Sequence, residues 1–270
     1  MIGAIIGDIV GSRYEFDNIK TKKFPLFSEP CMFTDDSVMT AAVAAALLEN
    51  RERGVPLGEA LTEQMRSFGR RHPHAGYGRR FSDWLAGDDP APYNSLGNGS
   101  AMRVSPCALA AGSLEEALSL AEASAAVTHD HPEGIRGAQA VAAAIFLART
   151  GADKAGIRAY VEENFYLLDF TLDEIRPSYR FDVTCRGSVP QGIEAFLESD
   201  GFEDALRNAV SIGGDSDTIA AMAGSIAWSY YGRDGIGGDM ARVREIARTF
   251  LTPDLLDAVD RFEAVFGAQA

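Results

Sequence analysis

The feature that most constrains the fold of this 270-residue chain is a pair of acidic turns, each of which opens a long run of small apolar residues. Asp35 and Asp36 begin the run in CMFTDDSVMTAAVAAALLEN, and Asp215 and Asp217 begin the run in SIGGDSDTIAAMAGSIA. Because such runs carry little side chain, they favour helices that pack closely in a protein interior. Four carboxylates brought together there repel one another strongly unless cations lie between them.

The aspartates also have an ordinary explanation as helix caps. Thr34 or Asp35 can cap a helix that begins near Asp36, because side-chain oxygens accept hydrogen bonds from the free amides of the first turn. Acidic residues also suit the positive end of the helix dipole, an effect typically worth about 0.3–1 kcal/mol each. One aspartate suffices as a cap, however, and the residues on both sides of TDDS are apolar. The surplus charge therefore indicates a functional site inside the protein.

The donor types in these turns indicate a class of metal. Carboxylates and threonine hydroxyls are hard oxygen donors, which suit Mg²⁺ or Mn²⁺, with Ca²⁺ less favoured. The EF-hand template fails, because counting from Asp215 places Ala220 and Ile226 at the positions where glycine and glutamate are required. Zinc is not favoured, since the chain has four histidines and none lies beside these turns.

Most of the remaining sequence has helical periodicity. Apolar residues recur at spacings of three and four in segments such as LEEALSLAEASAAV, EGIRGAQAVAAAIFLAR and GFEDALRNAVSI. Alternation at a spacing of two is scarce, and YRFDVT (179–184) is the best strand candidate. No linker or repeat divides the chain. We therefore expect an all-α fold with a single domain over residues 1–270, built as a compact bundle of ten or more helices.

The N-terminal segment GAIIGDIVGSRYEF places glycines at intervals of four residues. On a helix, Gly3, Gly7 and Gly11 form one smooth face that permits close packing, and Asp8 lies beside that face. Glu15 follows at the predicted end of the helix, where a negative charge is unfavourable to the helix dipole. A functional placement explains Glu15, and ordinary surface exposure is the alternative.

Composition excludes several classes of protein. The formal net charge of −14 argues against a broad nucleic-acid or anionic-membrane surface. The apolar stretches are too short to span a bilayer, and the N-terminus lacks the basic start of a signal peptide. Three widely spaced cysteines indicate neither a disulfide framework nor a thiolate zinc site. We expect a cytoplasmic protein.

Two glycine-rich segments are candidate anion sites. In YNSLGNGSAMRVSP, the residues from Gly97 to Ser100 can expose several amides near a helix N-terminus. In HPHAGYGRRF, Gly76 and Gly78 flank Tyr77. Tyr77 and Tyr93 are possible stacking faces for a base, and half-buried packing is the alternative for each.

The segment VTHDHPEGIRGAQA holds two of the four histidines. His129 and Asp130 fall in a turn before the next helix, because Pro132 follows so closely. A histidine that lines a polar cleft is favoured here over a histidine that binds metal.

Taken together, the motifs resemble those of one family, the ADP-ribosylglycohydrolases. The matching pieces are GDIVGSRYE, FTDDSVMT, AGYG, GNGSAMR, VTHDHPEG and SIGGDSDTIAAMAG, and they span most of the chain in the order of the family. One departure is Leu96, where some relatives have a stacking tyrosine. Tyr93 is the candidate substitute.

The resemblance implies an all-α fold with a cleft that holds two Mg²⁺ or Mn²⁺ ions. The metal ligands it implies are Thr34, Asp35, Asp36, Asp215, Asp217 and Thr218, and Glu15 matches a mobile acidic residue near the metals. The substrate contacts it implies, together with Tyr93, are Gly76, Tyr77, Gly78, Ser95, Asn98, Gly99, Ser100 and His129.

The function that follows is hydrolysis of the glycosidic bond between ADP-ribose and an acceptor, which can be a protein side chain, a nucleic-acid base or a small molecule. Asp35 or Asp36 is the candidate base, while Glu15 either orients the water or protonates the leaving group. The alternatives are a divalent-metal phosphohydrolase and a catalytically silent ADP-ribose-binding protein. The sequence leaves the acceptor open, and we expect a monomer.

Overall fold

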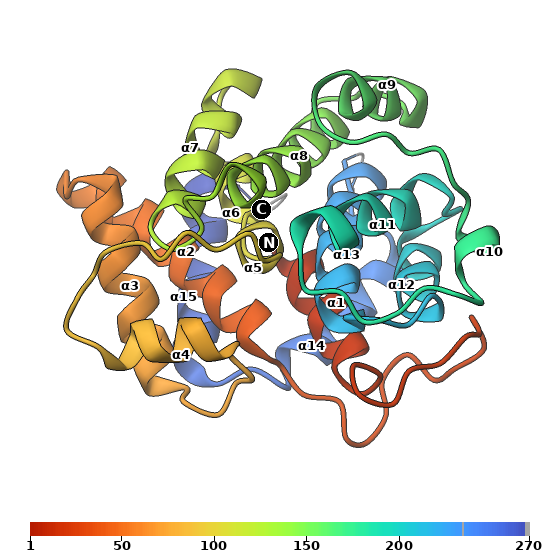
Figure 1. Cartoon of the computed structure of the whole chain (residues 1–270), viewed down its shortest axis with the longest axis horizontal. Coiled ribbons are helices and arrows are strands. Elements are labelled where there is room, and N and C mark those ends of the chain that lie inside the picture. The colour runs from red at the N-terminus through yellow and green to blue at the C-terminus, as the bar shows by residue number, and fades with distance from the viewer. Residues whose placement is uncertain (234, 268–270) are drawn as a thin grey trace.

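A computed structural model describes residues 1–233 and 235–267, and within these residues it contains helices and no β-strand. The all-α prediction is therefore confirmed (Figure 1). In chain order the helices are α1 (Ile2–Ser12), α2 (Asp35–Arg53), α3 (Leu57–Arg71), α4 (Arg79–Ala86), α5 (Gly99–Met102), α6 (Ser105–Ala110), α7 (Leu114–Ala126), α8 (Pro132–Arg149), α9 (Lys154–Asn164), α10 (Leu172–Ile175), α11 (Cys185–Leu197), α12 (Phe202–Ser211), α13 (Ser216–Tyr231), α14 (Gly238–Arg248) and α15 (Pro253–Phe266).

Helices α1 and α13 lie side by side in the middle of the molecule (Figure 1). The three glycines of α1 form the contact face, as their spacing predicts. A Cβ atom added at Gly7 would overlap the backbone of Ala220, and one at Gly3 would overlap the carbonyl of Gly224. The two backbones are therefore in direct contact, which larger side chains would prevent.

Two groups of helices lie on opposite sides of this pair (Figure 1). Helices α2, α3, α4 and α15 lie on one side, and α9 to α12 lie on the other. Helix α2 packs against α1, α3 and α15, and α8 packs against α7, α11 and α13. The main hydrophobic core runs through these contacts and includes buried residues from Met1 to Phe262.

The strand prediction for residues 179–184 was wrong. Residues 180–183 form no helix or strand in the structure, and only Thr184 pairs, in an isolated bridge with Gly97. The alternation of apolar residues there has another cause: Phe181 and Val183 are largely exposed at the mouth of a cavity. The chain then enters α11 directly, with Thr184 as its N-cap.

No helix in the described part of the chain is long and apolar enough to cross a membrane.

The close contact of α1 with α13 can be tested by adding one methyl group. We expect Gly7→Ala to lower the free energy of unfolding by about 1–3 kcal/mol or more, because the new Cβ overlaps the backbone of α13. Gly58→Ala in α3 is the matched control, since among the described residues no atom lies within 4 Å of its added Cβ. Urea unfolding of both variants makes the comparison, and equal stability of the two would contradict the packing described here.

Candidate active site

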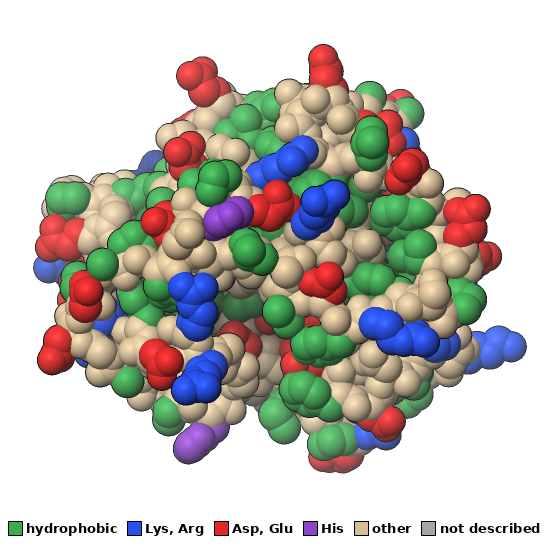
Figure 2. Space-filling view, viewed as in Figure 1, with side chains coloured by type: hydrophobic (Ala, Val, Ile, Leu, Met, Phe, Trp, Pro, Cys, Tyr) green, Lys and Arg blue, Asp and Glu red, His purple; other side chains and the backbone are tan. Residues whose placement is uncertain are grey.

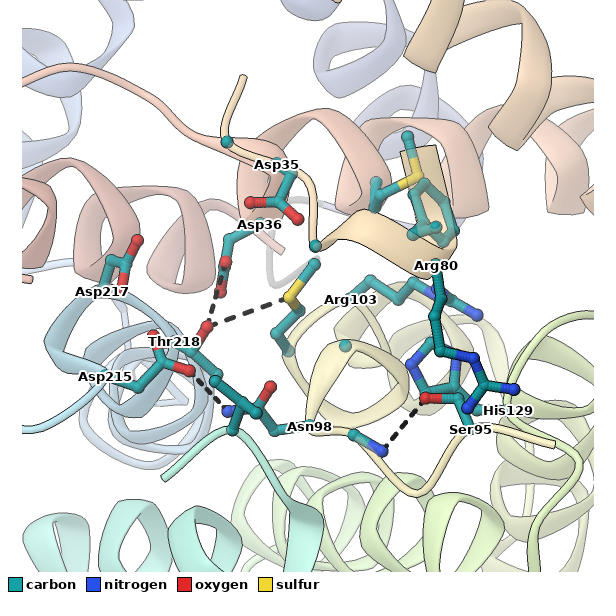
Figure 3. Close-up of a pocket in the computed structure, with 18 of the residues that line it drawn as sticks. Asp35, Asp36, Arg80, Ser95, Asn98, Arg103, His129, Asp215, Asp217 and Thr218 are labelled. Atoms are coloured by element: carbon teal, nitrogen blue, oxygen red, sulfur yellow. Dashed lines mark hydrogen bonds between the residues drawn. The ribbon is translucent and has the colours of Figure 1, made fainter. Parts of the chain in front are cut away.

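The acidic turns at the starts of α2 and α13 meet in the structure, as Figure 3 shows. Thr218 donates a hydrogen bond from its hydroxyl to Asp36 (3.1 Å), and the Thr34 hydroxyl, which donates to Asp8, lies 3.4 Å from an Asp217 oxygen. Each threonine hydroxyl thus lies next to an aspartate of the other turn. The two segments are about 180 residues apart in the sequence and form one polar cluster.

Capping accounts for only part of this cluster. Thr34 is the N-cap of α2, and its hydroxyl accepts a hydrogen bond from the amide of Asp36. Asp215 is the N-cap of α13, but among the described residues its side chain makes no capping hydrogen bond. It accepts instead from the Asn98 amide at 2.7 Å. The carboxylates of Asp35 and Asp215 are therefore not needed to cap these helices.

The turn before α13 depends on two glycines. Gly213 and Gly214 have φ values of 68° and 77°, in the left-handed region that glycine adopts without strain. The turn reverses the chain after α12 so that Asp215 and Asp217 face the start of α2 (Figure 3). The GG in the sequence was the visible signal for this turn.

Glu15 joins the cluster from the segment that follows α1. The sequence placed it at the helix end, and the structure places it three residues after Ser12. One carboxylate oxygen from each of Glu15, Asp215 and Asp217 lies within 4.8 Å of the other two. Burial, followed by the charge of Asp217, raises the pKa of Glu15 to about 8.

Asp8 is part of the same centre, and the sequence analysis gave it no role. Its fully buried carboxylate accepts hydrogen bonds from the amide and hydroxyl of Thr34 (2.9 and 2.7 Å) and from the amide and hydroxyl of Ser37. Burial raises its pKa to about 6, although these hydrogen bonds favour the charged form. Asp8 therefore holds the first turn of α2 against α1. The sequence feature that could have indicated this role is the position of a charged residue, Asp8, beside the glycine face of the helix.

The electrostatics of the centre are unfavourable without positive charge. Burial, followed by the charge of Asp217, raises the pKa of Asp35 and of Asp36 well above the ordinary value. For Asp217 the causes are burial and then the charge of Asp215. One oxygen of Asp36 and one of Asp217 are buried without a hydrogen-bond partner among the described residues. Buried, unpartnered carboxylate oxygens beside threonine hydroxyls fit the oxygen-only coordination of Mg²⁺ or Mn²⁺.

The centre forms one end of a cavity of about 450 Å³, within the range of ordinary ligand pockets. The face of the molecule shown in Figure 2 is hollowed near its middle, and Lys or Arg side chains lie beside the hollow. Arg79, Arg80 and Arg103 line the cavity. In Figure 3 the four aspartates lie at one end, and Arg80 and His129 lie at the other. The cavity is therefore acidic at one end and basic at the other.

The structure brings most of the predicted site residues to this cavity. The lining includes Glu15, Asp35, Asp36, Gly76, Gly78, Tyr93, Ser95, Asn98, Gly99, His129, Asp215, Asp217 and Thr218. The other three, Thr34, Tyr77 and Ser100, are not among the lining residues. Thr34 bonds to Asp8, the Tyr77 ring packs on Phe81 (5.5 Å between centroids), and the Ser100 hydroxyl donates to the Gly134 carbonyl at 2.7 Å.

The basic end contains a chain of contacts that the sequence did not reveal. The fully buried Arg103 guanidinium donates to the Thr128 hydroxyl at 2.8 Å, which pairs with His129 Nδ1 at 2.7 Å. Burial, followed by the charges of Arg103 and Arg80, holds the pKa of His129 well below its ordinary value, so this imidazole is neutral. The Arg80 guanidinium lies over the Tyr93 ring, 4.9 Å from its centroid. Two adjacent arginines after AGYG were the signal for this end.

The fold and the cavity define an all-α protein with a carboxylate centre suited to divalent cations, next to a basic pocket suited to an anionic ligand. Comparison with known proteins identifies the family. A family model described as ADP-ribosylglycohydrolase matches residues 1–269, and the chain belongs to this family of hydrolases. The resemblance seen in the sequence is thereby confirmed.

Individual relatives are similar over most of their length. Human ADP-ribosylhydrolase ARH3 is 28% identical, with 87% of this chain and 85% of the human protein covered. ADP-ribosylarginine hydrolase Tri1 of Pseudomonas putida (strain GB-1) is 27% identical, with 87% and 70% covered. A solved structure described as an ADP-ribosylglycohydrolase-related protein complex has a TM-score of 0.66 and 25% identity over 97% of this chain and 96% of that one.

The raised carboxyl pKa values determine how stability depends on pH. A carboxyl whose pKa is higher in the folded than in the unfolded state binds more protons when folded. The free energy of unfolding therefore decreases as pH rises from the pKa of the unfolded state to the pKa of the folded state. The pKa rises from 4.5 to about 8 for Glu15 and from 3.8 to about 6 for Asp215. We expect the thermal unfolding midpoint in EDTA to fall between pH 5 and pH 8, and Mn²⁺ or Mg²⁺ to reverse this fall.

Two variants distinguish the effect of the buried carboxyl cluster on the unfolding midpoint from the effect of removing any negative charge. Asp36→Asn removes one buried charge of the centre and should flatten the fall in EDTA. Asp257→Asn removes a surface carboxylate that lies 3.9 Å from Arg261, and it should leave the fall unchanged. A midpoint in EDTA that is flat or rises from pH 5 to pH 8 would contradict the electrostatic description.

Proposed function

We propose that this protein is a divalent-metal-dependent hydrolase that cleaves the glycosidic bond between ADP-ribose and an acceptor, reversing ADP-ribosylation. The observation that carries the proposal is the two-ended cavity, with buried carboxylates at one end and arginines at the other. The diphosphate of ADP-ribose is anionic and suits the basic end. The distal ribose is uncharged and rich in hydroxyls, and it suits a centre of oxygen ligands and cations.

The proposed metal ligands are those of the two acidic turns, namely Thr34, Asp35, Asp36, Asp215, Asp217 and Thr218. The partnerless oxygens of Asp36 and Asp217 support this set, because an unpartnered buried carboxylate is costly unless a cation compensates it. When bound here, two Mg²⁺ or Mn²⁺ ions supply positive charge that orients ribose hydroxyls and lowers the pKa of a water molecule.

The protons of the reaction are assigned to three carboxyls. Glu15 is the proposed group that protonates the leaving atom or orients the water, since its carboxyl lies with those of Asp215 and Asp217. Asp35 or Asp36 is the proposed base that takes a proton from the attacking water. Both line the cavity beside Glu15. The carboxylates left ionised then stabilise the oxocarbenium-like transition state at the anomeric carbon.

The rest of the lining is proposed to hold the ADP moiety. Gly76, Gly78 and the Gly97–Ser100 turn offer backbone close to the ligand, while Arg80 offers a guanidinium. Tyr93 is the proposed adenosine contact. Its ring lies near both Arg80 and His129, at centroid distances of 4.9 and 6.0 Å. Tyr77 packs on Phe81 instead, so a stacking role for its ring is not proposed.

The acceptor is the open part of the proposal. The name of the relative Tri1 specifies ADP-ribosylarginine, which makes an arginine-linked substrate the first to test.

A phosphohydrolase and a silent ADP-ribose-binding protein are the alternatives to the proposed function. Release of inorganic phosphate would favour the first, and binding of ADP-ribose without turnover would favour the second. That the protein acts as a monomer in the cytoplasm stays a prediction from its sequence.

The proposal is tested by assaying a panel of ADP-ribosylated acceptors in Mg²⁺, Mn²⁺ and EDTA and measuring the release of ADP-ribose. We expect Asp36→Asn and Asp217→Asn to reduce turnover by a factor of 10³ or more with the fold intact, since each removes a cation ligand. Asp257→Asn is the matched control and should keep full activity. Full activity of the wild-type protein in EDTA, or of either cluster variant with added metal, would overturn the metal-dependent mechanism.

The role of Glu15 has a separate expected result. Glu15→Gln keeps the shape of the side chain but cannot transfer a proton, so we expect turnover to fall about 10²–10⁴-fold while KM changes little. Steady-state kinetics of ADP-ribose release measure the two parameters. Normal turnover in this variant would remove Glu15 from the catalytic groups.

A further inference from the structure

The side chain of Asn18 joins the segment that carries Glu15 to the turn that carries Asp215. The Asn18 amide nitrogen lies within hydrogen-bond distance of the carbonyls of Tyr14 (2.6 Å), Glu15 (2.9 Å) and Gly214 (2.9 Å). Its side-chain oxygen accepts from the Gly214 amide at 2.7 Å. Both the donor and the acceptor of this side chain are therefore used.

These hydrogen bonds join two segments that are 196 residues apart in the sequence. Gly214 precedes Asp215 directly, and both of its backbone polar groups bond to Asn18. At the other end, the remaining amide hydrogen of Asn18 is shared between the carbonyls of Tyr14 and Glu15. The Asn18 amide thus links the backbone of Tyr14 and Glu15 to the backbone of Gly214, next to Asp215.

The position of Glu15 needs such a restraint, because the neighbouring carboxylates make this position electrostatically unfavourable for its side chain. Glu15 lies among like charges, and the nearby carboxylate of Asp217 repels it once both are ionised. The next residue, Phe16, is 86% exposed, and its ring contacts Phe181 at 6.3 Å between centroids. A stack so open to solvent restrains the segment weakly. Further along, the Lys20 ammonium donates to the carbonyls of Ile212 and Tyr179, which ties down the far side of the same segment.

We propose that Asn18 is a positioning residue that holds the Glu15 carboxyl at its working distance from Asp215 and Asp217. The inference deepens the proposed hydrolase function and rests on it for the role of Glu15. Asn18 does not line the cavity among the described residues, so it acts through Glu15 and not on the substrate. Its loss should therefore lower kcat and leave KM nearly unchanged, since the basic end that takes the ADP moiety is not touched.

The experiment is a double-mutant cycle between Asn18 and Glu15. We expect Asn18→Ala to lower kcat at least tenfold with less than a threefold change in KM, because small misplacements of a catalytic group are costly. In the Glu15→Gln background, the same substitution should lower kcat no further when Mn²⁺ is saturating for every variant. Asn18→Asp keeps the side-chain shape and an acceptor for Gly214, but it loses both donors and adds a negative charge beside three carbonyls. It should be impaired as Asn18→Ala is.

Asn50→Ala is the matched control, because Asn50 also bonds by its amide to a backbone carbonyl, that of Val55 at 2.8 Å, at the far end of α2. It should lose stability without losing kcat. Additive losses of kcat in the cycle, a loss confined to KM, normal turnover of Glu15→Gln, or failure of both Asn18 variants to fold would each overturn the proposal.

A second readout separates this inference from the proposed function. If the wild-type protein hydrolyses no ADP-ribosylated acceptor, the proposed function fails, and Asn18 is then judged by calorimetric titration with Mn²⁺ alone. We expect Asn18→Ala to weaken Mn²⁺ binding at least threefold, since the turn before Asp215 is released, while Asn50→Ala binds as the wild type does. Equal Mn²⁺ affinity of all three proteins would reject Asn18 as a positioning residue.

Discussion

The direct contact between the backbones of α1 and α13 is the constraint on which the rest of the structure depends. The glycine face of α1 lies so close to α13 that an added Cβ at Gly11 would overlap the backbone of Asp217. This approach brings the end of α1 to the start of α13. Asp8, on the same helix, holds the first turn of α2 against them through Thr34. Three helix ends therefore converge, and each one contributes carboxylates to a single volume.

The same convergence creates the charge that makes the site useful. Buried carboxyls at short range have raised pKa values, and the folded protein must hold them protonated or compensate them with cations. In the proposed function the second of these applies at neutral pH, and the partnerless oxygens of Asp36 and Asp217 are the atoms proposed to bind the cations. Repulsion in the centre lowers the free energy of unfolding of the cation-free protein. Bound ions would raise it again, because a ligand that binds only the folded state stabilises that state.

Local patterns predicted some of these features, and tertiary packing decided the others. The TDDS turn and the GG turn were visible because caps, charge and glycine act over a few residues. Asp8 was missed because its partners come from another helix, and Arg103 because nothing in AMR distinguishes a buried arginine from an exposed one. The sequence predicted the glycine pair Gly76 and Gly78 as part of the site. It could not predict the direction of the Tyr77 ring between them, because that depends on packing against Phe81. Alternation at 179–184 predicted a strand, whereas among the described residues Gly97 alone pairs with this segment, at Thr184.

The central claim is that the convergent carboxylates form a divalent-cation site, and calorimetric titration of the metal-free protein with Mn²⁺ tests it most directly. At pH 7 we expect saturable binding of two ions with release of protons, because the ligand carboxyls, whose pKa values are raised, must ionise to coordinate metal. Asp36→Asn and Asp217→Asn should each abolish binding of at least one ion. Absence of saturable binding, or unchanged stoichiometry and affinity in both variants, would contradict the account.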